Sequence, residues 1–140
     1  MSLYLDASVL VALFTSDALT ARADAWLRAR QPAVVVSDFA AAEFALAIVR
    51  RVRTGELAAD DARGVFTTFD DWTARVAGRV ETSPADVSTA AAYLRRLDLT
   101  LRTPDALNIA IAQRIGAELL TFDQKMAASA STLGLMVHGA

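Results

Sequence analysis

The sequence contains no cysteine, a single histidine and a single lysine among its 140 residues. Without cysteine the chain cannot form disulfides, thiolate zinc sites or a cysteine nucleophile. His138 is the one histidine, which excludes a multi-histidine metal site and argues against a histidine-based triad. We expect His138 to be a tail residue without a chemical role.

The chain also lacks excess positive charge and any long apolar run. Its net charge is −2, from 14 basic and 16 acidic residues, and all basic residues but Lys125 are arginines. Proteins that bind nucleic acids by counterion release are usually basic, so this chain needs another way to approach a phosphate. No uncharged apolar stretch reaches 18 residues, and the N-terminal apolar run lacks a basic start and contains Asp6. We therefore expect a cytoplasmic protein with no membrane span.

The composition is that of a folded protein, with 54% hydrophobic and 21% charged residues. A chain of this length fits one domain, which we expect to span residues 1–140. Short apolar runs alternate with longer helical patterns, and this alternation predicts an α/β fold with a mostly parallel sheet. We expect strands at 3–5, 33–36, 79–81, 118–121 and 135–138.

Helix start and stop signals separate these strands. Ser37, Ser83 and Thr103 are candidate N-terminal signals, the last two being followed by proline, and Gly55 and Gly116 are candidate stops. They predict helices at about 7–14, 19–29, 38–53, 58–74, 84–97 and 103–115, and a short one after residue 123. In the 58–74 helix, Phe66, Phe69 and Trp72 recur at helical spacing, and we expect them in the core.

Four acidic residues are candidates for chemistry. Asp6 and Asp123 follow predicted strands, at the edge where parallel sheets bind ligands. Asp105 lies in the first turn of its helix, and Glu43 lies in an otherwise apolar helical stretch. Asp6 and Asp123 could serve only as helix caps, and Asp105 could serve only to favour the positive end of its helix. Glu43 could be paired with a nearby arginine. Glu43 fits the structural alternative least well, because an unpaired buried acid is costly.

As a set, the four acids suggest a metal site. Two unit charges about 4 Å apart repel by about 4 kcal/mol at an effective dielectric near 20. Four converging carboxylates would therefore require cations, and an oxygen-only ligand set favours Mg²⁺ or Mn²⁺. Such ions can lower the pKa of a bound water and stabilise the leaving oxygen of a phosphodiester. Cleavage by a metal-bound water then needs no side-chain nucleophile.

At this point the sequence resembles the PIN-domain family, and most closely the VapC-type toxins of toxin–antitoxin pairs. The segments that carry the resemblance are YLDASVL (4–10), SDFAAAEF (37–44), TPDALNIA (103–110) and LTFD (120–123). The resemblance implies a three-layer α/β/α sandwich and an Mg²⁺- or Mn²⁺-dependent endoribonuclease. It also implies a homodimer and an antitoxin partner whose C-terminal segment lies across the acidic pocket.

Residue by residue, the resemblance makes Asp6, Glu43, Asp105 and Asp123 the catalytic, metal-binding acids. Ser8 and Thr121 match hydroxyl positions that support such a site. Asn108 departs from the family pattern, because many relatives carry histidine there, and it becomes a supporting candidate at the edge of the site.

Two further features have open interpretations. Arg50, Arg51 and Arg53 form a basic cluster at a helix end, which could contact RNA or an antitoxin or could simply match the negative helix terminus. The apolar helical stretch 39–49 could pack against a second copy of the chain.

Rival functions also remain open. One is a PIN-type nuclease with a processing role or another nucleic-acid substrate. Another is a receiver-like signalling module with Asp38 as phosphoacceptor, which would leave Glu43 unexplained. A third is a catalytically silent binding domain.

Overall fold

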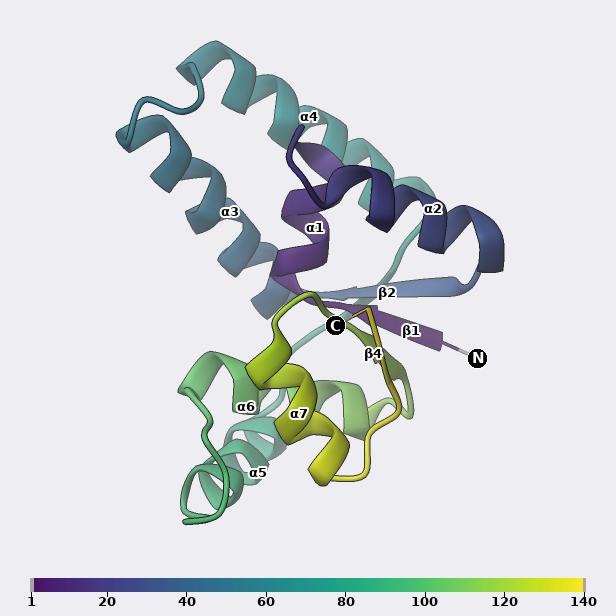
Figure 1. Ribbon diagram of the computed structural model, residues 1–140, viewed down its shortest axis with the longest axis vertical. Helices are drawn as coiled ribbons and strands as arrows, with labels where there is room; N and C mark the ends of the chain where they lie inside the picture. Colours follow the sequence, from purple (N-terminus) through teal and green to yellow (C-terminus); the bar gives the residue numbers. More distant parts are fainter. Residues whose placement is uncertain (1, 140) are drawn as a thin grey trace.

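The computed structural model describes residues 2–139, and within this range it contains one sheet of five strands and seven helices (Figure 1). Every strand pairing is parallel, and the strand order is β3-β2-β1-β4-β5. The sheet is thus wholly parallel, where the sequence predicted a mostly parallel one. The strands are β1 (Ser2–Leu5), β2 (Ala33–Ser37), β3 (Gly78–Val80), β4 (Glu118–Leu120) and β5 (Val137–His138).

The helices cover both faces of the sheet. One face carries α1 (Ala7–Phe14), α2 (Thr20–Arg30), α3 (Asp38–Arg53) and α4 (Ala59–Arg75), and the other carries α5 (Pro84–Leu94), α6 (Thr103–Arg114) and α7 (Gln124–Thr132).

Alternation along the central strand β1 divides the core in two. Leu3 and Leu5 join the cluster beneath α1, α3 and α4, whereas Tyr4 between them joins the cluster with α6 and α7. Successive strand residues point to opposite faces, so both faces of this buried strand need apolar cover. The predicted three-layer α/β/α sandwich is confirmed.

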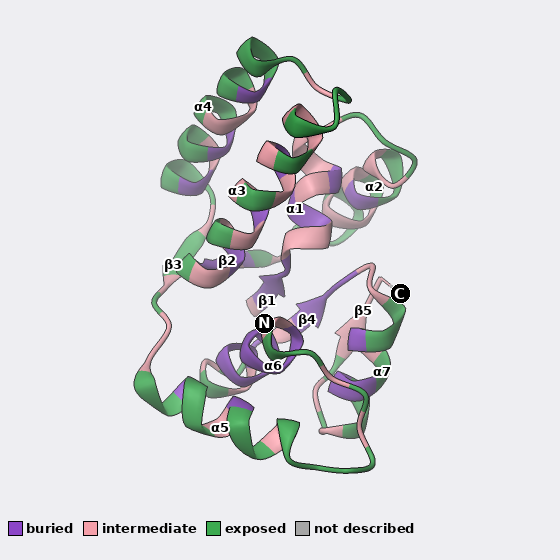
Figure 2. Cartoon of the chain, turned by 90° about the vertical axis from the view of Figure 1, so that its left-hand side faces the viewer, coloured by how far each residue is buried: buried purple, intermediate pink, exposed green. Residues whose placement is uncertain are grey.

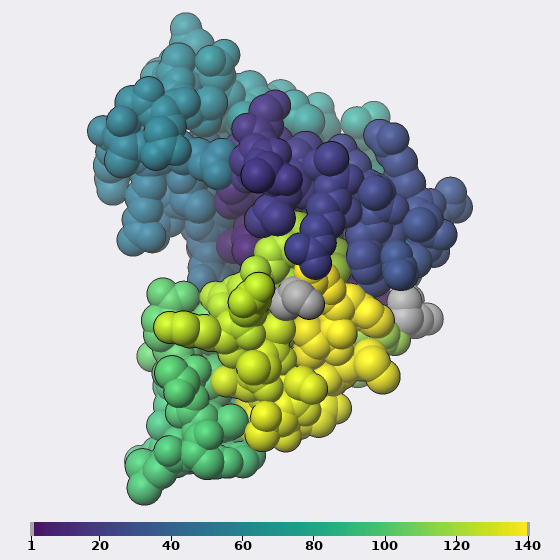
Figure 3. All heavy atoms as spheres, in the orientation of Figure 1, coloured from purple at the N-terminus to yellow at the C-terminus, as the bar shows by residue number. Residues whose placement is uncertain are grey.

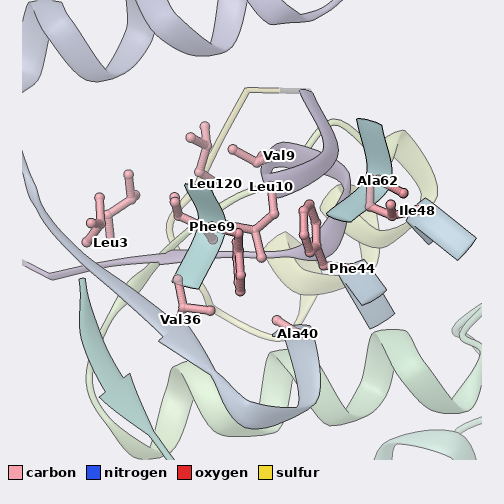
Figure 4. Packing of buried hydrophobic residues seen from close by; sticks show 12 residues of the cluster. Leu3, Val9, Leu10, Val36, Ala40, Phe44, Ile48, Ala62, Phe69 and Leu120 are labelled. Carbon is pink, nitrogen blue, oxygen red and sulfur yellow. The ribbon is translucent and has the colours of Figure 1, made fainter. Parts of the chain in front are cut away.

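Aromatic packing fixes the α1–α4 layer. The rings of Phe44 and Phe69 stack with centroids 4.4 Å apart, and Phe14 meets Phe69 edge-on at 5.3 Å. Figure 4 shows Phe44 and Phe69 beside Leu10 in this cluster. Phe69 is buried, and Phe66 and Trp72 are partly buried against the same cluster, so the predicted core position of all three is confirmed.

Local sequence signals account for the helix starts. The side chain of Ser37 accepts a hydrogen bond from the backbone N–H of Ala40 and caps α3. Ser83 and Asp86 form a capping box with Pro84 in the first turn of α5. Gly116 has φ +68°, a left-handed conformation that suits glycine after the end of α6.

Three expectations from the sequence were wrong in detail. α5 ends at Leu94 instead of residue 97, because Leu97 is fully exposed and has no core to pack against. The last strand begins at Val137 instead of residue 135, because the N–H of Leu135 bonds back to the carbonyl of Ala130 at the end of α7. His138 is not a loose tail residue: its Nε2 lies 2.6 Å from Glu118, and its ring packs on Trp26 at 5.2 Å.

α6 is the most enclosed helix, with every residue from Asp105 to Ala112 buried (Figure 2). This enclosed helix carries Asp105 in its first turn. Among residues 2–139, no helix has the length and apolar character needed to cross a membrane.

Candidate active site

The candidate site lies at the carboxyl-terminal edge of the sheet, between β1 and β4. After β1 the chain crosses over to β2 on one side, and β4 returns on the other side. Ligands in open parallel sheets bind at such a switch point, where the crossovers diverge and leave a crevice. In Figure 3 the surface is indented at this edge, between the α3 half of the molecule and the green residues of α6.

Asp6 is the most enclosed acid of the site. It directly follows β1 and is 4% exposed. One carboxylate oxygen accepts hydrogen bonds from the hydroxyl of Ser8 at 2.6 Å and the N–H of Val9 at 3.2 Å. The other oxygen accepts from the hydroxyl of Thr121, just after β4, at 2.5 Å. Asp6 therefore caps α1 and at the same time accepts hydrogen bonds from Ser8 and Thr121, the two hydroxyl residues that the sequence singled out.

Thr121 and Ser8 also fix the loop that carries Asp123. The Thr121 oxygen accepts from the N–H of Asp123 at 3.0 Å, and the Ser8 oxygen accepts from the N–H of Phe122 at 3.0 Å. Asp123 in turn caps α7 with one oxygen, which accepts from the N–H groups of Lys125 and Met126. Two hydroxyls thus connect the acid after β1 to the acid after β4.

A chain of hydrogen bonds holds Glu43. The Asn108 amide nitrogen donates to Glu43 at 2.7 Å and to the carbonyl of Pro104 at 2.9 Å. The Asn108 amide oxygen accepts from the buried hydroxyl of Tyr4 at 2.5 Å, and Ser37 lies 2.6 Å from that hydroxyl. Because the Pro104 carbonyl can only accept, the NH₂ group of Asn108 must face Pro104 and Glu43, which leaves the amide oxygen for the Tyr4 hydroxyl. The alternative of an arginine salt bridge to Glu43 is not realised within residues 2–139, where its hydrogen-bond partner is Asn108.

Arg102 brings a positive charge to the other two acids. Its guanidinium lies 3.5 Å from Asp105 and 3.8 Å from Asp123, and its backbone N–H donates to Asp105 at 3.3 Å. Asp105 is buried in the first turn of α6, whereas the Arg102 side chain is 76% exposed. Arg102 therefore connects the α6 acid to the α7 acid from the solvent side.

The acids also affect one another electrostatically. Burial raises the pKa of Asp6, against the hydrogen bonds from Ser8, Thr121 and Val9, and the charge of Asp123 raises it further. Burial likewise raises the pKa of Glu43; the Asn108 hydrogen bond opposes this shift, and the charges of Asp6 and Asp105 add to it. Carboxylates from four separate segments therefore act on one electrostatic environment, in which the ionised forms of Asp6 and Glu43 are costly.

The donor set fits a hard divalent cation, although the acids do not form a closed cage. Across residues 2–139, no three acidic, histidine or cysteine side chains come close enough together to hold a metal ion directly. The reason is visible in the contacts: Asp6 points to its hydroxyl donors, Glu43 to Asn108, and Asp105 and Asp123 toward Arg102. The guanidinium of Arg102 nevertheless occupies a cation position between two carboxylates, and every candidate ligand is an oxygen.

The remaining sequence candidates lie apart from this constellation. Arg50, Arg51 and Arg53 form the last turn of α3, two or more turns beyond Glu43, and Arg51 pairs with Asp17 at 3.3 Å. Asp38 accepts from the N–H and the hydroxyl of Thr82, contacts that tie the start of α3 to the loop after β3.

The sequence reasoning did not single out Tyr4, Ser37 or Arg102 as parts of the site. A tyrosine inside a buried strand is a usable signal, because its hydroxyl must find a partner there. Ser37 had a local explanation as a helix cap, which its hydrogen bond to the N–H of Ala40 confirms.

Comparisons with known proteins point to one family. The model of the family described as the PIN domain matches residues 3–130. Ribonuclease VapC46 of Mycobacterium tuberculosis is 32% identical over 139 residues, which cover 97% of this chain and 95% of that protein.

Solved structures share the fold at lower sequence identity. VapC20 of M. tuberculosis, described as a toxin that cleaves the sarcin–ricin loop, superposes with a TM-score of 0.75 at 19% identity, covering 96% of each chain. VapBC2 of Rickettsia felis, solved with a DNA fragment from its promoter, superposes with a TM-score of 0.72 at 14% identity, covering 99% of this chain and 98% of that one. At these identities the two structures support the fold and not the details of the site.

Proposed function

The chain belongs to the PIN-domain family, and from this premise we propose that it is a metal-dependent endoribonuclease, the toxin of a toxin–antitoxin pair. Asp6, Glu43, Asp105 and Asp123 are the proposed catalytic acids and the ligands of Mg²⁺ or Mn²⁺. The family match displaces the receiver-like interpretation, for which Asp38 would have been the phosphoacceptor.

The observation that carries this proposal is the shared environment of the four acids at the β1–β4 edge. The raised pKa values of Asp6 and Glu43 mean that their ionised forms are unfavourable unless positive charge is added. When bound, a divalent ion lowers the pKa of water and offsets the negative charge of a phosphodiester. The residues of this chain hold the acids in place: Ser8 and Thr121 fix Asp6, and Asn108 fixes Glu43.

The test is cleavage of a labelled RNA with Mn²⁺, Mg²⁺ or EDTA, comparing the wild type with Asp105→Asn. We expect cleavage only with a divalent ion, and its loss in Asp105→Asn at unchanged circular dichroism. Asp38→Asn is the matched control, because Asp38 also lies in the first turn of a helix, yet its partner is Thr82. Cleavage by Asp105→Asn at the wild-type rate would remove the assigned role.

The same assay separates the substrates. Running single-stranded DNA beside RNA distinguishes a ribonuclease from a nuclease with another nucleic-acid substrate, and a protein that cleaves neither is a silent binding domain. Ribonuclease VapC46 and the VapC20 toxin support the RNA choice.

We also propose a cognate antitoxin and a homodimer for this chain. The VapBC2 structure supports the first. We assign the contact between copies to the 39–49 stretch of α3, where Ala42 and Leu46 are exposed one turn apart. The packing of all described elements on one sheet supports a single domain over residues 1–140. A location in the cytoplasm would place the enzyme with cellular RNA.

A further inference from the structure

Arg102 is held loosely by two acids of the site. Its distances of 3.5 Å to Asp105 and 3.8 Å to Asp123 exceed those of a tight charge-assisted hydrogen bond, which are about 2.7–2.9 Å. Its side chain is 76% exposed, and ion pairs of such exposed groups contribute little to stability. The guanidinium can therefore leave the two carboxylates at small cost.

The charge of the site makes such a movable cation useful. A phosphodiester that approaches Asp6, Glu43, Asp105 and Asp123 meets negative charge in a protein whose net charge is −2. Among residues 2–139, Arg102 is the basic residue with ion pairs to these acids, and its charge also lowers the pKa of Glu43. The planar fork of arginine matches two oxygens of a phosphate.

Arg102 and the proposed divalent cation would also share the same two carboxylates. Asp105 and Asp123 are proposed metal ligands, and Arg102 faces one oxygen of each. A guanidinium and a divalent ion cannot both be fully paired with these two carboxylates, since like charges repel at this range. With a divalent ion on these carboxylates, the Arg102 guanidinium would lose its two ion pairs and be available to another anion.

We propose that Arg102 is a substrate-binding residue that exchanges partners: it pairs with Asp105 and Asp123 in the free protein and with a backbone phosphate in the RNA complex. This inference rests on the proposed function. It assigns the phosphate contact to the start of α6, and not to the arginine cluster at the end of α3.

The first test is a titration with Mn²⁺ in the absence of RNA, followed by electron paramagnetic resonance. Arg102→Gln removes the competing charge, so we expect it to bind Mn²⁺ about 3–10-fold more tightly than the wild type. Arg63→Gln is the matched control: Arg63 is 74% exposed and also pairs with an aspartate in an i,i+3 arrangement, but on α4. We expect the control to bind Mn²⁺ like the wild type.

The second test is the binding of a fluorescein-labelled RNA oligonucleotide, measured by anisotropy with Ca²⁺ in place of Mn²⁺ and with gels to confirm that the RNA stays intact. We expect Arg102→Gln to bind about 5–10-fold more weakly. The slope of the logarithm of its RNA-binding constant against the logarithm of the salt concentration should become shallower by about one, as expected when one phosphate contact is lost. Arg102→Lys should recover part of the affinity, because it restores the charge without the fork.

The results separate the two proposals. If the wild type binds and cleaves RNA, but Arg102→Gln and Arg63→Gln bind the RNA oligonucleotide with equal affinity, only the partner exchange is overturned. Tighter Mn²⁺ binding with unchanged RNA affinity also overturns it, because Arg102 is then only a counter-ion. A wild type that neither binds nor cleaves RNA overturns both proposals.

Discussion

Replacing Thr121 with valine tests the hydroxyl that links the two strand ends of the site. Thr121 is fully buried, donates to Asp6 at 2.5 Å and accepts from the N–H of Asp123 at 3.0 Å. Valine has nearly the same shape, so the substitution removes these two interactions and little packing. Because the acceptor is a buried carboxylate, the loss of stability should be larger than the loss caused by removing an ordinary side-chain hydrogen bond.

The magnitude follows from the two contacts. A hydrogen bond to a charged group contributes about 1.5–3 kcal/mol, and the unsatisfied N–H of Asp123 adds to the cost. We expect Thr121→Val to lower the free energy of unfolding by about 2–4 kcal/mol in total. For a chain of this size that corresponds to a fall in Tm of about 6–15 °C.

The assay is urea unfolding at neutral pH without metal, with Thr121→Ser as the control. Serine keeps the hydroxyl and loses one methyl group, at a cost of about 1 kcal/mol. The difference in the free energy of unfolding between the two variants should become smaller as the pH falls through the pKa of Asp6. The hydroxyl then donates to a neutral carboxyl group, which is a weaker acceptor than a carboxylate. The reasoning is refuted if Thr121→Val is as stable as Thr121→Ser at neutral pH.

Two further predictions follow from the same contacts. Burial raises the folded-state pKa of Glu43 above its unfolded value near 4.3. Between these two pKa values the folded state binds more protons than the unfolded state. The contribution of Glu43 to stability is therefore greatest below about pH 4 and is lost as the pH rises through the folded pKa. Glu43→Gln should therefore gain stability relative to the wild type between pH 5 and pH 8 in metal-free urea unfolding, and an equal difference at both pH values would contradict the assigned cause. Tyr4→Phe should cost about 1–3 kcal/mol, since it leaves the buried amide oxygen of Asn108 without its donor. Tyr93→Phe, which removes a half-buried hydroxyl bonded to Gln113 on the α5–α6 side, should cost less in the same unfolding assay, and equal losses would count against a special role for the Tyr4 hydroxyl.

The sequence alone determined the features that depend on neighbouring residues. The helix starts at Ser37, Ser83 and Asp123 rest on a side chain that bonds to an N–H two or three residues further on. Burial of both faces of β1 follows from its apolar residues. The four acids were visible as candidates because each follows a strand, starts a helix or interrupts an apolar stretch.

Only the tertiary structure decided how these candidates are connected. Thr121 reaches Asp6 across 115 residues of sequence, and Asn108 reaches Glu43 across 65. Such contacts depend on β4 lying beside β1 and on α6 packing below them, an order that many topologies of the same elements would not give. The end of α5 at Leu94 and the position of Arg102 over Asp105 and Asp123 have the same origin. Long-range packing, unlike a helix cap, brings together groups whose separation in the chain carries no information about their separation in space.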